Sequence, residues 1–241
     1  MSGESDPCSL GPAVNNGASS GDVDPARVQM NADAGRSEGR RRVIAVGLTG
    51  GIGAGKSTAL AEFSAAGALI LSADRIVHDL YEDPSLAARV VARLGPGVMG
   101  SGGGIDRSRL ATVVRNKADE LRWLEEITHP LVTAEIERAI SAAPDGSVLV
   151  CEVPLLFEAG LEEVFDLVVT IEASESERRR RSAHRTHPDA FAEFERLQTT
   201  TKERTAGSDL VFHNEDDVSA LRTFVRDAYA RALALLEDRP S

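Results

Sequence analysis

Short apolar runs alternate with longer stretches of helical spacing along most of the chain. The runs are rich in β-branched residues, which is typical of strands buried on both faces of a parallel sheet. The runs cover residues 43–48, 68–71, 147–151, 167–171 and 210–212, and the helical stretches include 57–63, 111–127 and 220–236. This alternation predicts an α/β fold with a parallel sheet.

Two parts of the chain depart from this alternation. Residues 1–42 are rich in small and polar residues without apolar periodicity, so they cannot bury enough surface to offset the entropy of ordering. We expect a disordered extension there, ending in three arginines (40–42) that form either a solvated junction or an anion contact, and one folded domain at 43–241. The spacer at 72–146 is too long for a single crossover helix. It therefore predicts a helical insert, at about 82–130, that binds the substrate.

The composition mainly excludes classes of protein. Lys and Arg number 27 and Asp and Glu 38, which gives a net charge of −11 and argues against a general binder of nucleic acid or anionic membranes. No uncharged apolar stretch reaches the ~18 residues needed to span a bilayer, and no signal-peptide pattern opens the chain. Two cysteines, Cys8 and Cys151, cannot form a disulfide framework. We expect a soluble cytoplasmic protein, whose oligomeric state the sequence leaves open.

A glycine-rich loop follows the first predicted strand and opens the first predicted helix. Residues 50–57 match G-x-x-x-x-G-K-[ST], a pattern that wraps phosphate oxygens with backbone amides at the positive end of a helix dipole. In this pattern Lys56 reaches the β- and γ-phosphates and the Ser57 hydroxyl holds Mg²⁺. A merely flexible turn needs no Lys-Ser at that offset, so the loop predicts binding of a nucleoside triphosphate. The residues expected to contact it are Gly51, Ile52, Gly53, Ala54, Gly55, Lys56, Ser57 and Thr58.

Two other classes of nucleotide-binding protein fit the rest of the sequence poorly. Residues 116–119 match the N-K-x-D pattern that reads guanine, but they lie in a predicted helical stretch rather than after a strand. The D-x-x-G that a GTPase switch also needs occurs nowhere in the chain. A ring-forming motor needs an apolar run ending in Asp-Glu after the third strand, which is lacking. The remaining class is a small phosphotransferase, which works mainly by positioning and charge stabilisation.

A phosphotransferase needs a group that accepts the proton of the acceptor hydroxyl. Asp74 follows the second predicted strand, at the edge where a doubly wound sheet binds ligands beside the phosphate loop. Capping of the following helix by Ser72 or Asp74 fits the same position, and the pattern leaves both interpretations open.

A second basic concentration lies at about 175–206 and includes Arg178–Arg181, Arg185, Arg196, Lys202 and Arg204. In an acidic protein this reversal predicts a lid that closes positive charge over the transferring phosphates, with a solvated arginine face as the alternative.

Several segments together resemble dephospho-coenzyme A kinases, over about residues 43–236. The segments are Gly47–Gly53, Ala73-Asp74, Trp123-Leu124 with Ile127–Leu131, Val153–Glu158 with Gly160-Leu161, and Ser208–Asn214. The His-Pro and Pro-Leu-Leu-Phe-Glu segments are the specific ones. Taken by themselves, His129-Pro130 predicts only a helix boundary and 154–158 only a strand end that turns into a loop.

The resemblance implies ATP-dependent phosphorylation of the ribose 3′-hydroxyl of dephospho-coenzyme A, the last step of coenzyme A synthesis. It implies a P-loop kinase core with a parallel sheet, a helical substrate-binding insert and a lid. It also implies Asp74 as the base, Lys56 on the phosphates, Arg181 on the transferring group and Mg²⁺ with Ser57. The substrate-binding residues are expected to be Asp74, His129, Leu155, Glu158 and Arg185. The alternative is a P-loop kinase of another nucleoside-like or small hydroxyl substrate.

The sequence departs from the family mostly in the lid. Thr186-His187 follow Arg185 where the family has Asp-Gly, and Thr200 stands where a glutamine is expected. Ser72 replaces the first carboxylate of a frequent Asp-x-Asp. The sequence leaves open which of Arg180 and Arg181 faces the phosphates.

Overall fold

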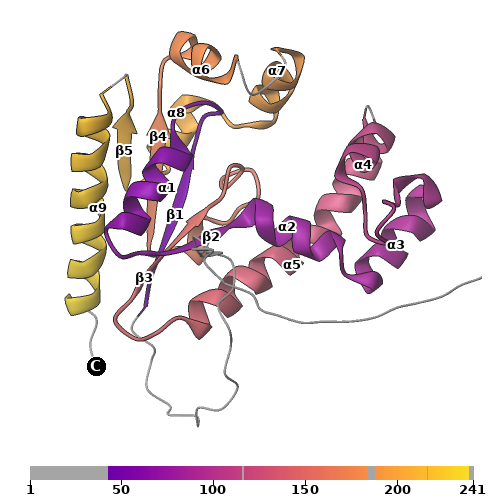
Figure 1. Ribbon diagram of the computed structural model, residues 1–241, viewed down its shortest axis with the longest axis horizontal. Helices are drawn as coiled ribbons and strands as arrows, with labels where there is room; N and C mark the ends of the chain where they lie inside the picture. Colours follow the sequence, from indigo (N-terminus) through magenta and orange to yellow (C-terminus); the bar gives the residue numbers. More distant parts are fainter. Residues whose placement is uncertain (1–42, 116, 184–187, 216, 239–241) are drawn as a thin grey trace, which may run out of the picture. The chain divides into compact units, whose positions relative to one another are not determined.

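A parallel sheet lies at the centre of the described part of the chain. The computed structural model describes residues 43–115, 117–183, 188–215 and 217–238, so the expected extension at 1–42 lies outside the described residues. Within them, five strands pair in the order β2-β3-β1-β4-β5 (Figure 1). The strands are β1 (Ile44–Gly50), β2 (Leu69–Ser72), β3 (Val148–Glu152), β4 (Leu167–Glu172) and β5 (Leu210–His213). All five predicted strands and the α/β fold class are confirmed.

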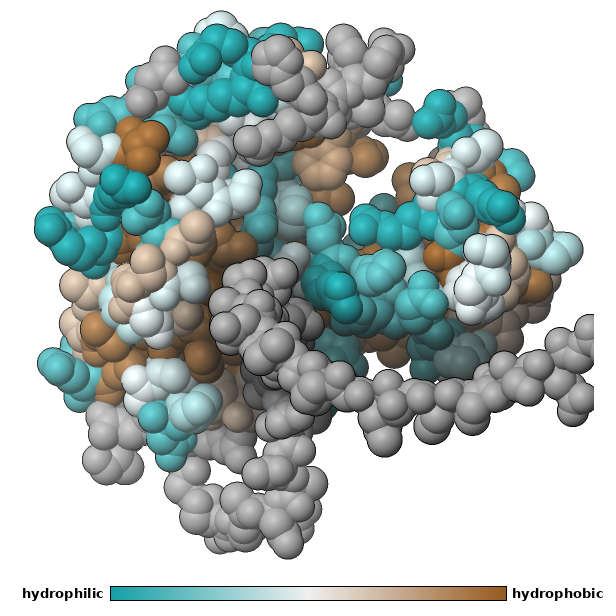
Figure 2. Space-filling model, viewed as in Figure 1, coloured by the Kyte–Doolittle hydropathy of each residue, from teal (hydrophilic) through white to brown (hydrophobic). Residues whose placement is uncertain are grey.

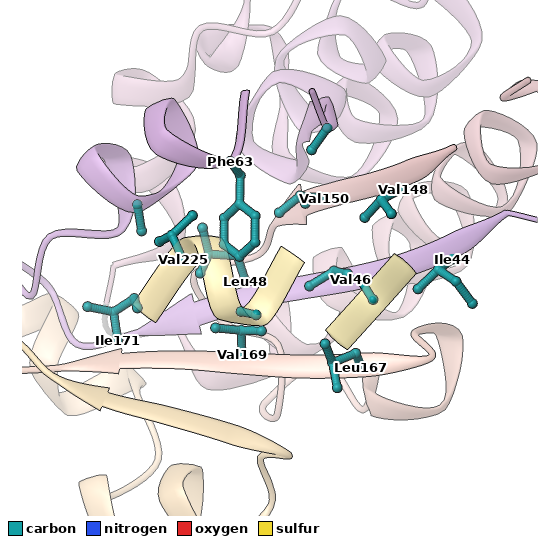
Figure 3. Packing of buried hydrophobic residues seen from close by; sticks show 14 of the residues in the cluster. Ile44, Val46, Leu48, Phe63, Val148, Val150, Leu167, Val169, Ile171 and Val225 are labelled. Atoms are coloured by element: carbon teal, nitrogen blue, oxygen red, sulfur yellow. The ribbon is translucent and has the colours of Figure 1, made fainter. Parts of the chain in front are cut away.

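Both faces of the central strand β1 are buried, which explains its uninterrupted apolar run. One face packs beneath α1 (Lys56–Ala65) and α9 (Val218–Asp238), where Phe63 and Val225 meet Leu48 and Val169 (Figure 3). The other face packs against α2 (Ala73–Tyr81) and α5 (Ala118–Ala142). Each fully buried side chain of this size contributes about 1.5–3 kcal/mol, so the sheet is the rigid base of the molecule.

The spacer between β2 and β3 is helical, as predicted. It contains α2, α3 (Pro84–Leu94), the 3₁₀ turn η1 (Pro96–Val98), α4 (Arg107–Val114) and α5. The predicted helical stretch 111–127 is in fact divided, because α4 ends at Val114 and α5 begins at Ala118. Lys117 and Asp119 of the N-K-x-D pattern therefore lie between and within helices rather than after a strand.

The helix boundary predicted at His129-Pro130 is wrong, because α5 continues through Pro130 to Ala142. A proline inside a helix removes one hydrogen bond and costs about 3 kcal/mol. Beyond Pro130, Val132 and Ile136 are buried against the sheet, and their burial offsets that cost.

The helices between β4 and β5 gather at the carboxyl end of the sheet, near the start of α1 (Figure 1). They are α6 (Glu175–Ser182), α7 (Pro188–Leu197) and α8 (Thr201–Ala206), and a 3₁₀ turn η2 (Glu162–Val164) precedes β4. The space-filling view shows a hollow between this end of the sheet and the α3–α5 helices (Figure 2). None of the described helices is long and apolar enough to cross a membrane.

Candidate active site

The turn between β1 and α1 forms one wall of the candidate site. Gly55 is the N-cap of α1 with φ 111°, and Gly53 has φ 77°, a region that other residues rarely adopt. A Cβ at Gly53 would lie 2.5 Å from the carbonyl oxygen of Arg178 and 2.6 Å from Oγ of Ser182. Only glycine therefore lets α6 pack directly on this loop.

A cavity of about 260 Å³ opens against the loop. Its walls are the loop and the first residues of α1, Glu152 at the end of β3, and Arg181 and Ser182 of α6. Helix N-termini and glycine-rich loops of this kind bind phosphate groups. The cavity thus brings together most of the residues that the sequence assigned to nucleotide binding.

Lys56 is folded back onto the loop. Its Nζ donates to the carbonyl oxygens of Gly50 and Gly51 at 2.9 and 3.1 Å. Burial lowers the pKa of Lys56, whereas the carboxylates of Glu152 and Glu172 raise it. Lys56 is therefore a half-buried cation whose charge is supported by the carboxylates at the ends of β3 and β4.

Asp74 lies in the first turn of α2, with an exposed side chain. Ser72 is the N-cap of that helix, and its side chain makes no capping hydrogen bond. Asp74 stands two residues beyond the cap, so the capping interpretation does not describe it. Its charge raises the pKa of both Lys56 and Glu152, which places all three groups in one electrostatic cluster.

Glu152 is a member of this cluster that sequence reasoning missed. It ends β3 in register with Leu48 of β1 and Ser72 of β2, and it lines the cavity. Burial raises the pKa of its carboxyl, Lys56 lowers it, and Asp74 raises it. The available signal was a carboxylate directly after an apolar strand, at the edge where ligands bind.

The structure distinguishes the two arginines that the sequence left undecided. Arg181 is half-buried, lines the cavity, and donates from Nη2 to the carbonyl oxygen of Asn214 at 3.0 Å. Arg180 is exposed and forms a 2.7 Å ion pair with Glu177. Arg181 is therefore the arginine of this pair that reaches the phosphate loop.

Two other arginines of the predicted lid serve the fold. Arg178 is buried and donates to Glu195 at 2.6 Å, joining α6 to α7. Arg204 is buried in an ion pair with Glu172, its Nε 2.6 Å from Oε1, and it also donates to the carbonyl of Thr199. The sequence had counted Arg204 among charges aimed at the phosphates. That expectation is wrong, because its charge is neutralised inside the protein.

The remaining predicted substrate residues occupy separate segments. His129 is half-buried in α5, and Leu155 is half-buried after β3. Oε1 of Glu158 accepts a hydrogen bond from the backbone of Thr199, while its buried Oε2 has no partner among the described residues. Arg185 lies outside the described residues.

A glutamine, Gln198, lies two residues before Thr200, the position where the family resemblance led us to expect one. Thr200 caps α8 in a capping box with Glu203. Two residues earlier, the side chain of Gln198 is buried and bonds to the backbone of Gly50 and Ile52 in the phosphate loop. Polarity alone gave no sign of this role, since a glutamine at a helix end is normally a surface residue.

The chain is similar in sequence to several known proteins. A family model described as dephospho-CoA kinase matches residues 44–220. The chain is 37% identical over 197 residues to a dephospho-CoA kinase of Methylococcus capsulatus, covering 80% of this chain and 98% of the relative. It is 38% identical over 193 residues to one of Streptomyces avermitilis, covering 78% and 93%.

Solved structures show the same fold. A Thermus thermophilus protein aligns with a TM-score of 0.65 at 29% identity, covering 82% of this chain and 98% of that one. Dephospho-CoA kinase from Campylobacter jejuni aligns with a TM-score of 0.54 at 20% identity over 79% of this chain and 98% of its own, a likeness that shows the fold alone.

Proposed function

The chain belongs to the dephospho-CoA kinase family, and on that premise we propose which of its residues perform each part of the reaction. The enzyme transfers a phosphoryl group from ATP to the ribose 3′-hydroxyl of dephospho-CoA, which completes coenzyme A synthesis. The observation that carries the assignment of roles is the meeting of Lys56, Glu152 and Arg181 at one cavity, with Asp74 in electrostatic reach.

Asp74 is the general base. Its carboxylate is exposed, and it lies two residues beyond the end of β2, which pairs with the strand that carries Glu152. There it accepts the proton of the 3′-hydroxyl as the oxygen attacks the γ-phosphorus, while the bond from the γ-phosphorus to the β,γ-bridging oxygen breaks and ADP leaves. A positioned base contributes about 10²–10⁴ to the rate of such a step.

Lys56 and Arg181 hold the charge of the transferring group from two directions. Lys56 sits at the start of α1 and exchanges its bonds with Gly50 and Gly51 for bonds to the β- and γ-phosphates. Arg181 reaches the same cavity from α6 and binds the transferring group through its planar guanidinium. Charge that is fixed in place before the reaction stabilises the transition state without reorganisation.

A magnesium ion fits this donor set. Mg²⁺ is usually held by one or two carboxylates together with substrate phosphates, and Ser57 and Glu152 line the same cavity. Among the described residues, no group of three or more His, Cys, Asp or Glu side chains forms a complete metal site. Ser57 and Glu152 would therefore hold Mg²⁺ jointly with ATP, and the ion would offset the phosphate charge.

We assign substrate binding and closure over the phosphates to the helices on the two sides of the hollow. The insert at about 82–130, carrying His129 next to its end, holds dephospho-CoA together with Leu155 and Glu158 after β3. The segment at about 175–206, which includes Arg185, acts as a lid over the phosphates. The net charge of the whole chain, −11, suits a cytoplasmic enzyme with small-molecule substrates and no nucleic-acid partner.

A coupled assay for ADP formation tests the function. The purified chain is given ATP and Mg²⁺ with dephospho-CoA, adenosine, uridine or shikimate offered separately. We expect turnover with dephospho-CoA to exceed turnover with the other acceptors by orders of magnitude. Faster turnover with another acceptor would favour a kinase of a different nucleoside-like or small hydroxyl substrate.

A further inference from the structure

Gln198 connects three segments that are distant in the sequence. It stands between α7 and α8, and only 9% of the residue is exposed. Its Nε2 donates to the carbonyl oxygens of Gly50 and Pro154 at 3.1 and 2.9 Å, and its Oε1 accepts from the amide of Ile52 at 3.1 Å. Both amide hydrogens and the carbonyl oxygen of the side chain thus bond to backbone groups that are distant in the sequence.

The bond to Gly50 involves a carbonyl that Lys56 also uses. Gly50 accepts from Lys56 Nζ at 2.9 Å and from Gln198 Nε2 at 3.1 Å. When Lys56 turns to the phosphates of ATP, the carbonyl loses the first donor and keeps the second. A buried carbonyl without any donor is unfavourable, so Gln198 lowers the free-energy cost of releasing Lys56.

The other two bonds fix the geometry of the site. The bond from Ile52 holds the phosphate loop in its bent form. Pro154 lies two residues beyond Glu152, so the bond to its carbonyl fixes the end of β3 relative to the loop. The β1–β3 ladder already pairs Glu152 with Leu48, and the side chain of Gln198 adds a direct link between the phosphate loop and the segment that follows Glu152.

We infer that Gln198 is a positioning residue that ties the phosphate loop to the segment following Glu152 and lowers the cost of releasing Lys56 from Gly50 to ATP. It contacts no reacting atom. The inference rests on the proposed function only in so far as that function requires ATP at this loop.

The junction that carries Gln198 is anchored independently. The amide of Thr199 donates to Glu158, and its carbonyl accepts from Arg204. Substituting the side chain of Gln198 therefore removes the contacts to the loop while these two contacts still hold the junction in place.

Two substitutions and one matched control test the inference. Gln198→Met keeps the volume and removes all three hydrogen bonds. Gln198→Glu keeps the acceptor for Ile52 but turns a carboxyl oxygen toward two carbonyl oxygens. Leu197→Gln changes the neighbouring residue, which is 49% exposed. Binding of a non-hydrolysable ATP analogue is measured by calorimetry, together with kcat, the KM of each substrate, and the melting temperature.

We expect Gln198→Met to weaken binding of the ATP analogue about tenfold, as for the loss of one to two net hydrogen bonds. The KM for dephospho-CoA should stay unchanged, Gln198→Glu should bind the analogue more weakly still, and Leu197→Gln should match the wild type. A Gln198→Met enzyme that binds the analogue like the wild type overturns the inference, whatever its melting temperature. Failure of Gln198→Met to fold also overturns it, because the contact would then serve the fold.

Binding of the analogue needs no acceptor, so failure of the proposed function is visible separately. In that case the wild type would make no product from dephospho-CoA, and the comparison of ATP affinities would remain valid.

Discussion

Replacing Arg204 by methionine should destabilise the protein far more than replacing an exposed arginine. The guanidinium of Arg204 and the carboxylate of Glu172 are 4% and 1% exposed, with Nε 2.6 Å from Oε1. Arg204 also donates to the carbonyl of Thr199 and to Oγ1 of Thr201. Oε2 of Glu172 already has no hydrogen-bond partner among the described residues. Arg204→Met would therefore leave a buried carboxylate without its ion-pair partner.

The size of the effect follows from that burial. Removing one partner of a buried ion pair costs about 3–5 kcal/mol, because the other charge stays buried and uncompensated. For a domain of this length, each kcal/mol lowers the melting temperature by roughly 2–4 °C, which gives a fall of roughly 6–20 °C. The double variant Arg204→Met/Glu172→Met removes both charges and should regain most of the loss.

Urea unfolding followed by circular dichroism measures these differences. Arg196→Met, which changes an exposed arginine, is the control and should stay within about 0.5 kcal/mol of the wild type. A loss of less than about 1 kcal/mol for Arg204→Met would refute the reasoning on the buried pair. A stable Arg204→Met protein with a greatly reduced kcat would instead show that Arg204 acts on the phosphates.

Two further predictions concern groups that line the cavity. Arg181→Lys loses the planar, bidentate guanidinium, so kcat should fall by more than about tenfold while an ATP analogue still binds, and Arg180→Lys should behave as the wild type. The reverse pattern would place Arg180 at the phosphates. Burial raises the pKa of Glu152 in the folded state, so its contribution to stability is fully present below the unfolded pKa and is lost as pH rises through the folded pKa. Glu152→Gln should therefore raise the melting temperature at pH 7 but not at acid pH, while turnover falls; equal melting temperatures at pH 7 would contradict this.

The parts of the fold that the sequence predicted were those set by local pattern. The β-branched run at 43–48 and the Lys-Ser pair after the last glycine of the loop each follow a short-range rule. Such rules were enough to predict the strands and the glycine-rich turn between β1 and α1. Pro130 shows the limit of such rules, because the burial of Val132 and Ile136 beyond it is a tertiary effect that outweighs the local preference of proline.

The missed parts of the site depend on contacts between distant segments. Gln198 meets Gly50 across 148 residues, and no spacing in the sequence marks that pair. The roles of Glu152 and Arg204 could not be predicted from their charge either. Strand order brings Glu152 beside β1 and into the cavity, whereas burial against Glu172 removes Arg204 from it. The charge of a side chain indicates that it interacts with another charged group, but the fold determines which group that is.

The kcat of Asp74→Asn with dephospho-CoA tests the central claim most directly. Asparagine keeps the shape of the Asp74 side chain, but it cannot accept the hydroxyl proton. The account predicts a folded protein that binds the ATP analogue like the wild type and whose kcat falls about 10²–10⁴-fold at several Mg²⁺ concentrations. A kcat equal to that of the wild type, or one restored by high Mg²⁺, would contradict Asp74 as the base.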